Sequence, residues 1–297
     1  MALVVVVVAF ASLRPSGATV ASAEKPTQVA AATVAAPAPA STPTPELKVQ
    51  PAAQPKAKAK ATTTPKPSTA APTPTKPKPR PVEKTLPEKM AKLPAGTRQI
   101  VVITGERIGS KSGRLMLYEK DGSRWVEVMN VVANFGDNGL VDGEKRKQGN
   151  LQTPTGIWTI GSFVFGLHSS APGGTKMPYR PIKNSSYWSS ERDSTYNTWV
   201  DHRVSGEHLI DADPQYEYAF NTGYNSPPNK RVIGRGTAIF IHCFEPPGNS
   251  LGKYTHGCIA ISPDNMIALF KKLDPAKKPA CAIGTLQKGS ATSIWAY

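Results

Sequence analysis

Residues 238–261 read AIFIHCFEPPGNSLGKYTHGCIAI, and the rest of the chain is best interpreted outward from this stretch. It carries two of the five histidines and two of the three cysteines of the chain. One apolar run leads into His242, and a second one, at 259–261, follows Cys258. Each run is typical of a buried strand, and the Pro/Gly/Asn-rich segment 246–252 predicts a loop between them. Two neighbouring strands would therefore present an imidazole and a thiol close together.

This pairing of side chains suggests covalent catalysis. A thiolate is a strong nucleophile at neutral pH, and a nearby imidazole can take the thiol proton. We expect Cys258 to be the nucleophile and His242 to be its base, approaching from the neighbouring strand. His256 is the other candidate base, because on an extended strand its side chain would share one face with Cys258. Gly257 would let a substrate carbonyl approach the backbone, where the Cys258 N–H could help to form an oxyanion hole.

Two other interpretations of the same residues stay open. Cys258 could be a buried free thiol beside structural histidines, because unreactive cysteine is common in protein cores. His242, His256 and Cys258 could also bind zinc, although a fourth ligand and CxxC-type spacing are lacking. These residues alone therefore allow catalysis, metal binding or a structural role.

The N-terminal segment has the composition of an export signal. Residues 3–13 form an apolar stretch of the length of a signal-peptide core, and the small residues 21–23 fit a cleavage site. A basic segment ahead of the apolar stretch is lacking, so we expect residues 1–23 to be either a signal peptide or an uncleaved N-terminal anchor. The protein is then expected at the cell wall or the outer face of the cytoplasmic membrane, secreted or anchored.

Residues 24–95 are rich in Pro, Ala, Thr and Lys and contain no aromatic residue. Such a segment cannot bury enough apolar surface to offset its ordering entropy, so it predicts a disordered, extended linker. It carries 12 basic and 4 acidic residues, and thus contributes +8 to the net charge of +15. The simplest interpretation is a solvated linker with no specific partner. A basic tail of this kind also suits anionic wall polymers or a membrane surface, and the export signal argues against nucleic acid.

Residues 96–297 are predicted to form one mainly β domain with one or two short helices. The predicted strands lie at 99–104, 114–119, 125–129 and 157–160. Turn residues join the second and third of these strands, which predicts a hairpin. The polar, glycine-rich segment 136–150 predicts a loop.

The second half of this domain is harder to interpret. Residues 161–235 show weak periodicity and many aromatic residues, so they predict either a binding lid or rings buried in the core. After Cys258, Ser262 as N-cap, Pro263 and an acidic residue in the first turn predict the start of a helix. Asp274 and the following proline predict its end.

The cysteine motif resembles that of the L,D-transpeptidase (YkuD-type) catalytic domain. The signature of that family is a His, a variable loop, and then Ser/Thr-His-Gly-Cys followed by an apolar residue. Residue His242 and residues 255–259 match it. Residues 153–156 resemble the family's upstream Thr-Pro-x-Gly segment. Two further segments, 144–149 and 232–236, are similar to a subgroup found in filamentous actinobacteria.

The resemblance spans about residues 98–285 and implies a β-sandwich core and acyl transfer in peptidoglycan. Cys258 would attack the L,D-peptide bond of a donor stem tetrapeptide, release D-Ala and transfer the acyl group to an acceptor stem amine. His242 would be the base, oriented by a backbone carbonyl near Cys243. The supporting and oxyanion residues would be Thr255, His256, Gly257 and Cys243. The resemblance implies no metal and no organic cofactor, and it makes carbapenem β-lactams candidate covalent inhibitors.

The chain departs from the family pattern in two places. Ala260 stands where many members have Arg, which concerns how the donor stem is held. Cys243 stands where many members have Gly, and it adds a thiol beside the site. Three cysteines in an exported chain allow a Cys243–Cys281 disulfide that leaves Cys258 free.

The leading hypothesis is therefore an exported peptidoglycan L,D-transpeptidase that acts on stem peptides. The nearest alternative is an L,D-carboxypeptidase, in which water replaces the acceptor amine. A non-catalytic cell-wall-binding module is the alternative from a different class, and the intact Cys258/His242 pair argues against it.

Overall fold

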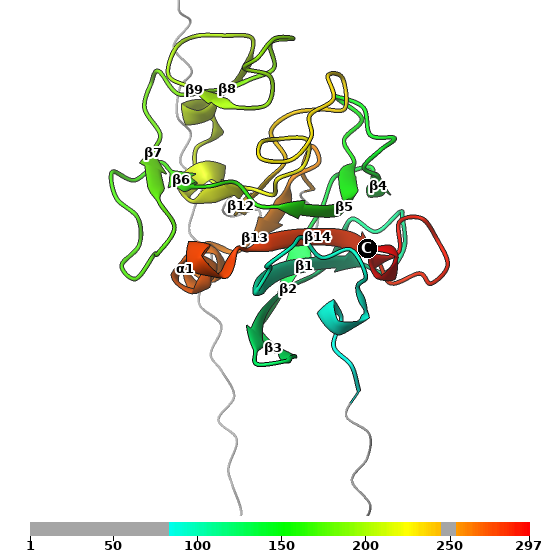
Figure 1. Cartoon of the computed structure of the whole chain (residues 1–297). Coiled ribbons are helices and arrows are strands. Elements are labelled where there is room, and N and C mark those ends of the chain that lie inside the picture. The colour runs from blue at the N-terminus through cyan, green and yellow to red at the C-terminus, as the bar shows by residue number, and fades with distance from the viewer. Residues whose placement is uncertain (1–82, 245–253) are drawn as a thin grey trace, which may run out of the picture. The chain divides into compact units, whose positions relative to one another are not determined.

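The computed structural model describes residues 83–244 and 254–297. The predicted export signal, most of the predicted linker and the predicted loop at 246–252 lie outside these residues. Strands dominate the described part (Figure 1). They are β1 (Gln99–Gly105), β2 (Ser112–Asp121), β3 (Arg124–Asn134), β4 (Leu140–Asp142), β5 (Thr153–Thr159), β6 (Val164–Gly166), β7 (Tyr179–Pro181), β8 (Tyr187–Ser189), β9 (Trp199–Val200), β10 (Gly206–His208), β11 (Ala219–Asn221), β12 (Phe240–Cys243), β13 (Ile259–Ile261) and β14 (Ala280–Thr285).

The described helices are one α-helix and five short 3₁₀ segments. They are α1 (Pro263–Lys272), η1 (Pro87–Lys89), η2 (Leu209–Ala212), η3 (Gln215–Glu217), η4 (Pro275–Lys277) and η5 (Ile294–Ala296). None of the helices within the described ranges is long and apolar enough to cross a membrane.

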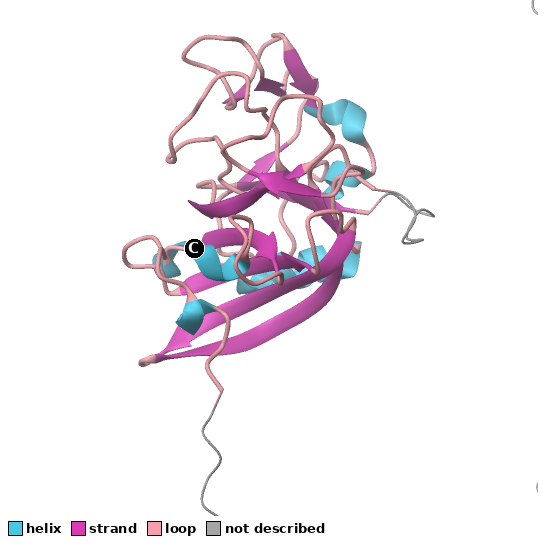
Figure 2. Cartoon of the chain, turned by 90° about the vertical axis from the view of Figure 1, so that its right-hand side faces the viewer, coloured by secondary structure: helices cyan, strands magenta, loops and turns pink. Residues whose placement is uncertain are grey.

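Eleven strands form one sheet in the order β4-β5-β14-β1-β2-β3-β13-β12-β11-β6-β7, and a small sheet has the order β10-β8-β9. The large sheet curls so that its two halves pack face to face (Figure 2). Val101 and Leu115 from one half share a core with Ile241 and Ile259 from the other. The fold is thus the mainly β, sandwich-like architecture that the sequence predicts.

Strand β1 is apolar at every position but its ends because both of its faces are buried. Val101 and Ile103 face the main core, whereas Ile100 and Val102 face a second cluster that includes Trp125. The strand pairs in parallel with β14 and antiparallel with β2, so neither edge is open. A strand buried on both faces has a continuous apolar run, and the prediction at 99–104 is confirmed.

The predicted hairpin and the predicted helix are both present. Strands β2 and β3 pair along their whole length and are longer than the predicted runs. Helix α1 begins where predicted, with the Ser262 hydroxyl accepting a hydrogen bond from the Asn265 N–H at 3.4 Å. Its buried residues are Met266, Leu269 and Phe270. The i, i+3, i+4 spacing of these side chains is what lets one helix face close the core.

Residues 161–235 contain six short strands and two 3₁₀ helices, which differs from the loop-like character of their sequence. Most of their aromatic rings are buried: Trp188, Tyr196, Trp199, Tyr216, Tyr218 and Tyr224. These buried rings do not form an exposed lid, although Tyr216 also lines a cavity. Strands of two or three residues are too short to show a period in sequence. For the same reason β4 was hidden in the predicted loop 136–150.

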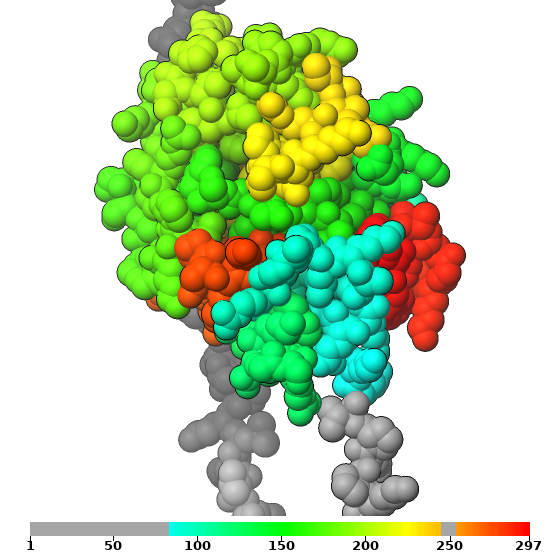
Figure 3. Space-filling model, viewed as in Figure 1, coloured from blue at the N-terminus to red at the C-terminus, as the bar shows by residue number. Residues whose placement is uncertain are grey.

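The packed domain begins ahead of the boundary predicted at residue 96. Met90 is buried, and Leu86 and Leu93 pack against the same cluster as Trp295. The Ala91 N–H also donates to the C-terminal carbonyl of Tyr297 at 2.6 Å. In Figure 3 the first described residues, in cyan, lie beside the C-terminal segment, in red. A short apolar run inside a proline-rich segment gave no sign of this packing.

Candidate active site

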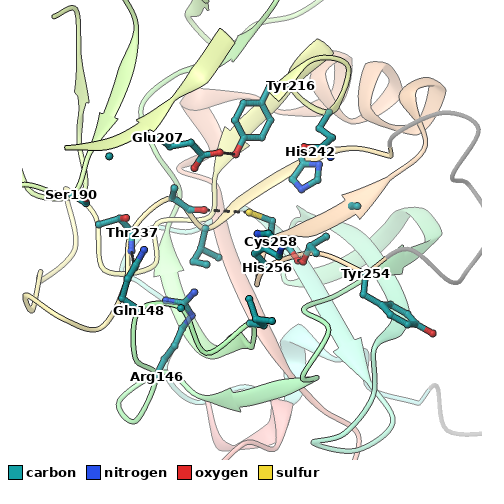
Figure 4. A pocket seen from close by; sticks show the side chains of 18 of the residues that line it. Arg146, Gln148, Ser190, Glu207, Tyr216, Thr237, His242, Tyr254, His256 and Cys258 are labelled. Atoms are coloured by element: carbon teal, nitrogen blue, oxygen red, sulfur yellow. Dashed lines mark hydrogen bonds between the residues drawn. The ribbon is translucent and has the colours of Figure 1, made fainter. Parts of the chain in front are cut away.

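A cavity of about 730 Å³ opens where β12 and β13 run side by side (Figure 4). The two strands are parallel, with Ile241 opposite Ile259 and His242 opposite Ala260. His242 lies on β12, and Cys258 lies immediately before β13, so both side chains line the cavity. The structure thus brings together the two residues that the sequence proposes as nucleophile and base. A concave site of this size suits a small peptide.

The imidazole of His242 is 7% exposed and has a fixed orientation. Its Nδ1 lies 2.7 Å from the carbonyl oxygen of Cys243. A carbonyl only accepts hydrogen bonds, so Nδ1 is the protonated nitrogen and Nε2 is left as the acceptor. Burial lowers the pKa of His242 to about 4. The ring is therefore neutral at physiological pH and can take a proton on Nε2.

The thiol of Cys258 is held by two backbone groups. It donates to the Ala238 carbonyl at 3.2 Å and accepts from the Phe240 N–H at 3.4 Å. Burial, together with the charge of Glu207, raises the pKa of Cys258 to about 12. Among the described residues, the Cys258 thiol donates its hydrogen bond to the Ala238 carbonyl and not to the His242 ring. The site therefore holds a neutral thiol and a neutral imidazole.

Thr255 holds the turn that delivers the cysteine. Its hydroxyl donates to the Cys258 carbonyl at 2.6 Å and accepts from the Gly257 N–H at 3.1 Å. Gly257 has φ of 130°, and a Cβ at this position would lie 2.8 Å from the Gln152 carbonyl oxygen. Only glycine fits this backbone comfortably. Because Thr255 engages the Gly257 N–H, the Cys258 N–H remains the candidate for the oxyanion hole.

The expected shared strand face of His256 and Cys258 is wrong. The chain bends at His256 and Gly257, and β13 starts only at Ile259. His256 is exposed and lines the mouth of the cavity. The left-handed backbone at Gly257 breaks the strand alternation on which the prediction depended.

Arg146 lines the same cavity and was not predicted as a site residue. The side chain is only 3% exposed, and it donates to the carbonyls of Gln152 and Arg235, both at 2.9 Å. Burial lowers its pKa, while its positive charge acts to lower the pKa of Cys258. In the sequence Arg146 stands in a charged segment that is typical of a solvated loop, so its burial could not be predicted.

Glu207 and Tyr216 form a second unpredicted part of the wall. The Tyr216 hydroxyl donates a short hydrogen bond to a carboxylate oxygen of Glu207. The Tyr216 ring also packs edge-on to His242, with centroids 5.6 Å apart. Tyr216 stood among the aromatic residues whose sequence allowed either a lid or a core role. Its contact with His242 could not be inferred from the sequence without the fold.

The remaining cysteines are buried free thiols, so the Cys243–Cys281 disulfide is not formed. The Cys243 thiol points toward the Tyr218 carbonyl at 3.6 Å, and Cys281 is buried on β14. Burial raises the pKa of Cys243 to about 12, as it does for Cys258, so the pKa does not separate the two thiols. Cys243 is buried, whereas Cys258 is partly exposed in the cavity. Across the two described ranges, no three His, Cys, Asp or Glu side chains are grouped as a metal site. The zinc interpretation therefore has no geometric support there.

The fold places a cysteine and a histidine in one cavity, and comparison with known proteins gives its family. The sequence model of the L,D-transpeptidase catalytic domain family (YkuD) matches residues 97–283. The match covers more than half of the chain, and the chain therefore belongs to this family. No curated protein matches the sequence.

Two solved structures are similar at low identity. One is the helical cell shape determining protein Pgp2 from Campylobacter jejuni, with 18% identity, 65% of this chain and 49% of that chain covered, and a TM-score of 0.37. The other is Bd1075 from Bdellovibrio bacteriovorus, with 17% identity, coverage of 63% and 48%, and a TM-score of 0.31. The matched part thus spans about half the length of these solved chains.

Proposed function

We propose that the protein is an exported peptidoglycan L,D-transpeptidase with Cys258 as nucleophile and His242 as base. The observation that carries this proposal is the pair of side chains in one cavity, with the imidazole tautomer set by the Cys243 carbonyl. That tautomer leaves Nε2 ready to take the thiol proton. Membership of the L,D-transpeptidase family supports the reaction class.

The proposed reaction has two acyl-transfer steps. Cys258 attacks the carbonyl of the L,D-bond in a donor tetrapeptide while His242 takes its proton, and the Cys258 N–H stabilises the oxyanion. The proton then passes to the leaving nitrogen, and D-Ala departs from a thioester. An acceptor stem amine attacks the thioester, which forms the cross-link and restores the thiol.

Arg146 supports this proposal by supplying a cation that Ala260 does not. A Cβ built on Gly257 would lie 3.0 Å from Arg146 Nη2, so the guanidinium borders the turn that carries the nucleophile. A donor stem carries carboxylates, which a buried guanidinium binds well. We infer that Arg146 helps to hold the donor stem.

The location of the protein is also part of the proposal. The apolar stretch and the small residues ahead of residue 24 support export, and the basic composition of residues 24–95 supports contact with anionic wall polymers. The combination would place the catalytic domain where stem peptides are found.

Product analysis with a disaccharide-tetrapeptide tests the reaction. Incubation with the full-length protein should give a dimer that has lost one D-Ala. A tripeptide product without any dimer would identify an L,D-carboxypeptidase instead. Absence of turnover, together with absence of a carbapenem adduct on Cys258, would favour a non-catalytic wall-binding module.

A further inference from the structure

The carboxylate of Glu207 has no evident role in activating the nucleophile. Glu207 lies on β10, and Tyr216 lies on η3, and both line the cavity that holds Cys258 (Figure 4). Figure 4 shows this pair on one side of the thiol and Arg146 on the other. A negative charge beside a thiol opposes thiolate formation. The position of Glu207 therefore calls for another explanation.

The pair is built to keep one carboxylate in place. Tyr216 is 3% exposed, and its ring packs edge-on to Phe240 and to His242, with centroids 5.5 Å and 5.6 Å away. Its hydroxyl donates to one oxygen of Glu207. Burial raises the pKa of both groups, that of Tyr216 well above its usual value, so the phenol stays a donor and the carboxyl group takes up a proton more readily than an exposed one. Among the described residues no lysine, arginine or histidine forms an ion pair with Glu207.

The second step of the proposed reaction needs a carboxylate near the thioester. The acceptor is a primary amine, which is largely an ammonium ion near neutral pH. An ammonium ion has no lone pair, so it must lose one proton before its nitrogen can attack the thioester. His242 supplies a proton to the departing D-Ala nitrogen in the first step, and returns to the neutral form. A carboxylate near the thioester can both attract the ammonium and take its first proton.

We propose that Glu207, positioned by Tyr216, is the acceptor-binding carboxylate, and that it recognises the primary ammonium group of the acceptor stem. This inference rests on the proposed transpeptidase function. The ammonium gives one proton to Glu207, and the neutral nitrogen attacks the thioester carbonyl. The second proton passes through His242 to the sulfur of Cys258 as the C–S bond breaks. The proton on Glu207 is released to water.

Hydrolysis of the thioester, with water as the acceptor, needs neither the ion pair between an ammonium group and Glu207 nor the proton transfer to Glu207. Glu207 should therefore control how the acyl-enzyme divides between cross-linking and hydrolysis. The change Glu207→Gln keeps the size of the side chain and an oxygen that can accept from Tyr216, but removes the charge. We expect the ratio of dimer to tripeptide, per acyl-enzyme formed, to fall by on the order of 10²-fold.

The test uses the full-length protein and a disaccharide-tetrapeptide as both donor and acceptor. Acyl-enzyme is followed by intact mass, and dimer and tripeptide by chromatography. Glu207→Asp should recover part of the lost dimer, because it keeps the carboxylate. Glu217→Gln is the matched control: it lies on η3, pairs with His168 at 3.2 Å and does not line the cavity. It should leave the product ratio unchanged.

A second measurement avoids any variant. An acceptor stem whose amine is trimethylated keeps its charge but cannot attack, whereas an acetylated stem is neutral. The trimethylated stem should inhibit dimer formation by the native protein, and the acetylated stem should inhibit it much less. Equal inhibition by both stems, or an unchanged product ratio in Glu207→Gln, would overturn the role of Glu207. Absence of any acyl-enzyme in the native protein would instead contradict the proposed function itself.

Discussion

Burial acts in opposite directions on the pKa values of the thiol and the imidazole, and it leaves both groups uncharged. It raises the pKa of Cys258 to about 12 and lowers that of His242 to about 4. A preformed thiolate–imidazolium pair is therefore not the resting state of this site. In the proposed reaction the Cys258 thiol is activated only when His242 accepts its proton, which ties reactivity to the position of the substrate.

The first prediction separates the two histidines. His242→Ala should slow formation of the acyl-enzyme by roughly 10² to 10⁴-fold, because it removes a general base. His256→Ala should cost far less, since His256 lies exposed at the cavity mouth. The rate is measured by intact mass after rapid quenching in acid. A larger loss in the His256 variant would exchange the two roles.

The second prediction concerns the pH dependence of stability. Between the folded pKa of about 4 and an unfolded value of about 6.5, the unfolded state binds the proton and the folded state does not. Acidification through this window should therefore cost about 3 kcal/mol of unfolding free energy through His242 alone. His242→Gln should reduce that loss when urea unfolding is compared near pH 7 and pH 4.5, and an equal loss in both proteins would show that His242 is not the titrating group.

The sequence predicts the residues of the site that belong to one local motif. Cys258, Thr255 and Gly257 stand together in the chain, and the chemistry of each type is evident from its neighbours. Arg146 enters the cavity from the segment before β5 and Glu207 enters it from β10, so only the folded chain brings them to the thiol. Local sequence patterns contain no information about contacts between residues that are distant in the chain.

At the scale of elements, the turn between residues 255 and 258 determines the position of Cys258 in the cavity. Thr255 bonds both to the Gly257 N–H and to the Cys258 carbonyl. Thr255→Val keeps the shape but loses both bonds, which should cost about 1–3 kcal/mol of stability and also lower the acylation rate. Thr255→Ser should preserve both properties. Thermal unfolding and acylation kinetics check this, and a fully active valine variant would refute the role of the turn.

Arg146 joins three segments that line the cavity, and its contribution can be measured. Arg146→Lys keeps the charge but cannot repeat the two hydrogen bonds to the Gln152 and Arg235 carbonyls. We expect a loss of about 1–3 kcal/mol in unfolding free energy. Arg203→Lys, at an exposed position, is the control and should unfold like the native protein. Similar stability of the two variants would mean that Arg146 does not hold these segments.

Element length explains which parts of the fold were predictable. Strands β1, β2 and β3 and helix α1 are long enough to show a period and end signals, and the sequence predicts all four. Strands β6 to β10 have two or three residues each, and their positions depend on the buried aromatic rings. Tertiary packing, rather than local preference, places such short strands.

At the scale of the whole molecule, the folded domain includes part of the proline-rich segment. Leu86, Met90 and Leu93 pack against a cluster that contains Trp125 and Trp295. Their removal would expose the two tryptophans to water. Burying an aliphatic side chain stabilises a protein by about 1.5–3 kcal/mol when the burial is complete.

The fifth prediction follows from this packing. A chain of residues 83–297 should have the same melting temperature as the full-length protein, because the packed residues are all present. A chain of residues 96–297 should melt lower, by on the order of 10 °C. Calorimetry of the two chains measures the difference. Equal melting temperatures would place the start of the folded domain at the boundary predicted from sequence.

The most direct test of the account is whether a donor stem acylates Cys258. The full-length protein is mixed with a disaccharide-tetrapeptide, quenched in acid, and examined by intact mass and by mapping of the modified peptide. We predict an adduct of the stem minus D-Ala on Cys258, which is absent in Cys258→Ala. An unmodified Cys258 during turnover, or an adduct on Cys243 or Cys281, would contradict the central claim.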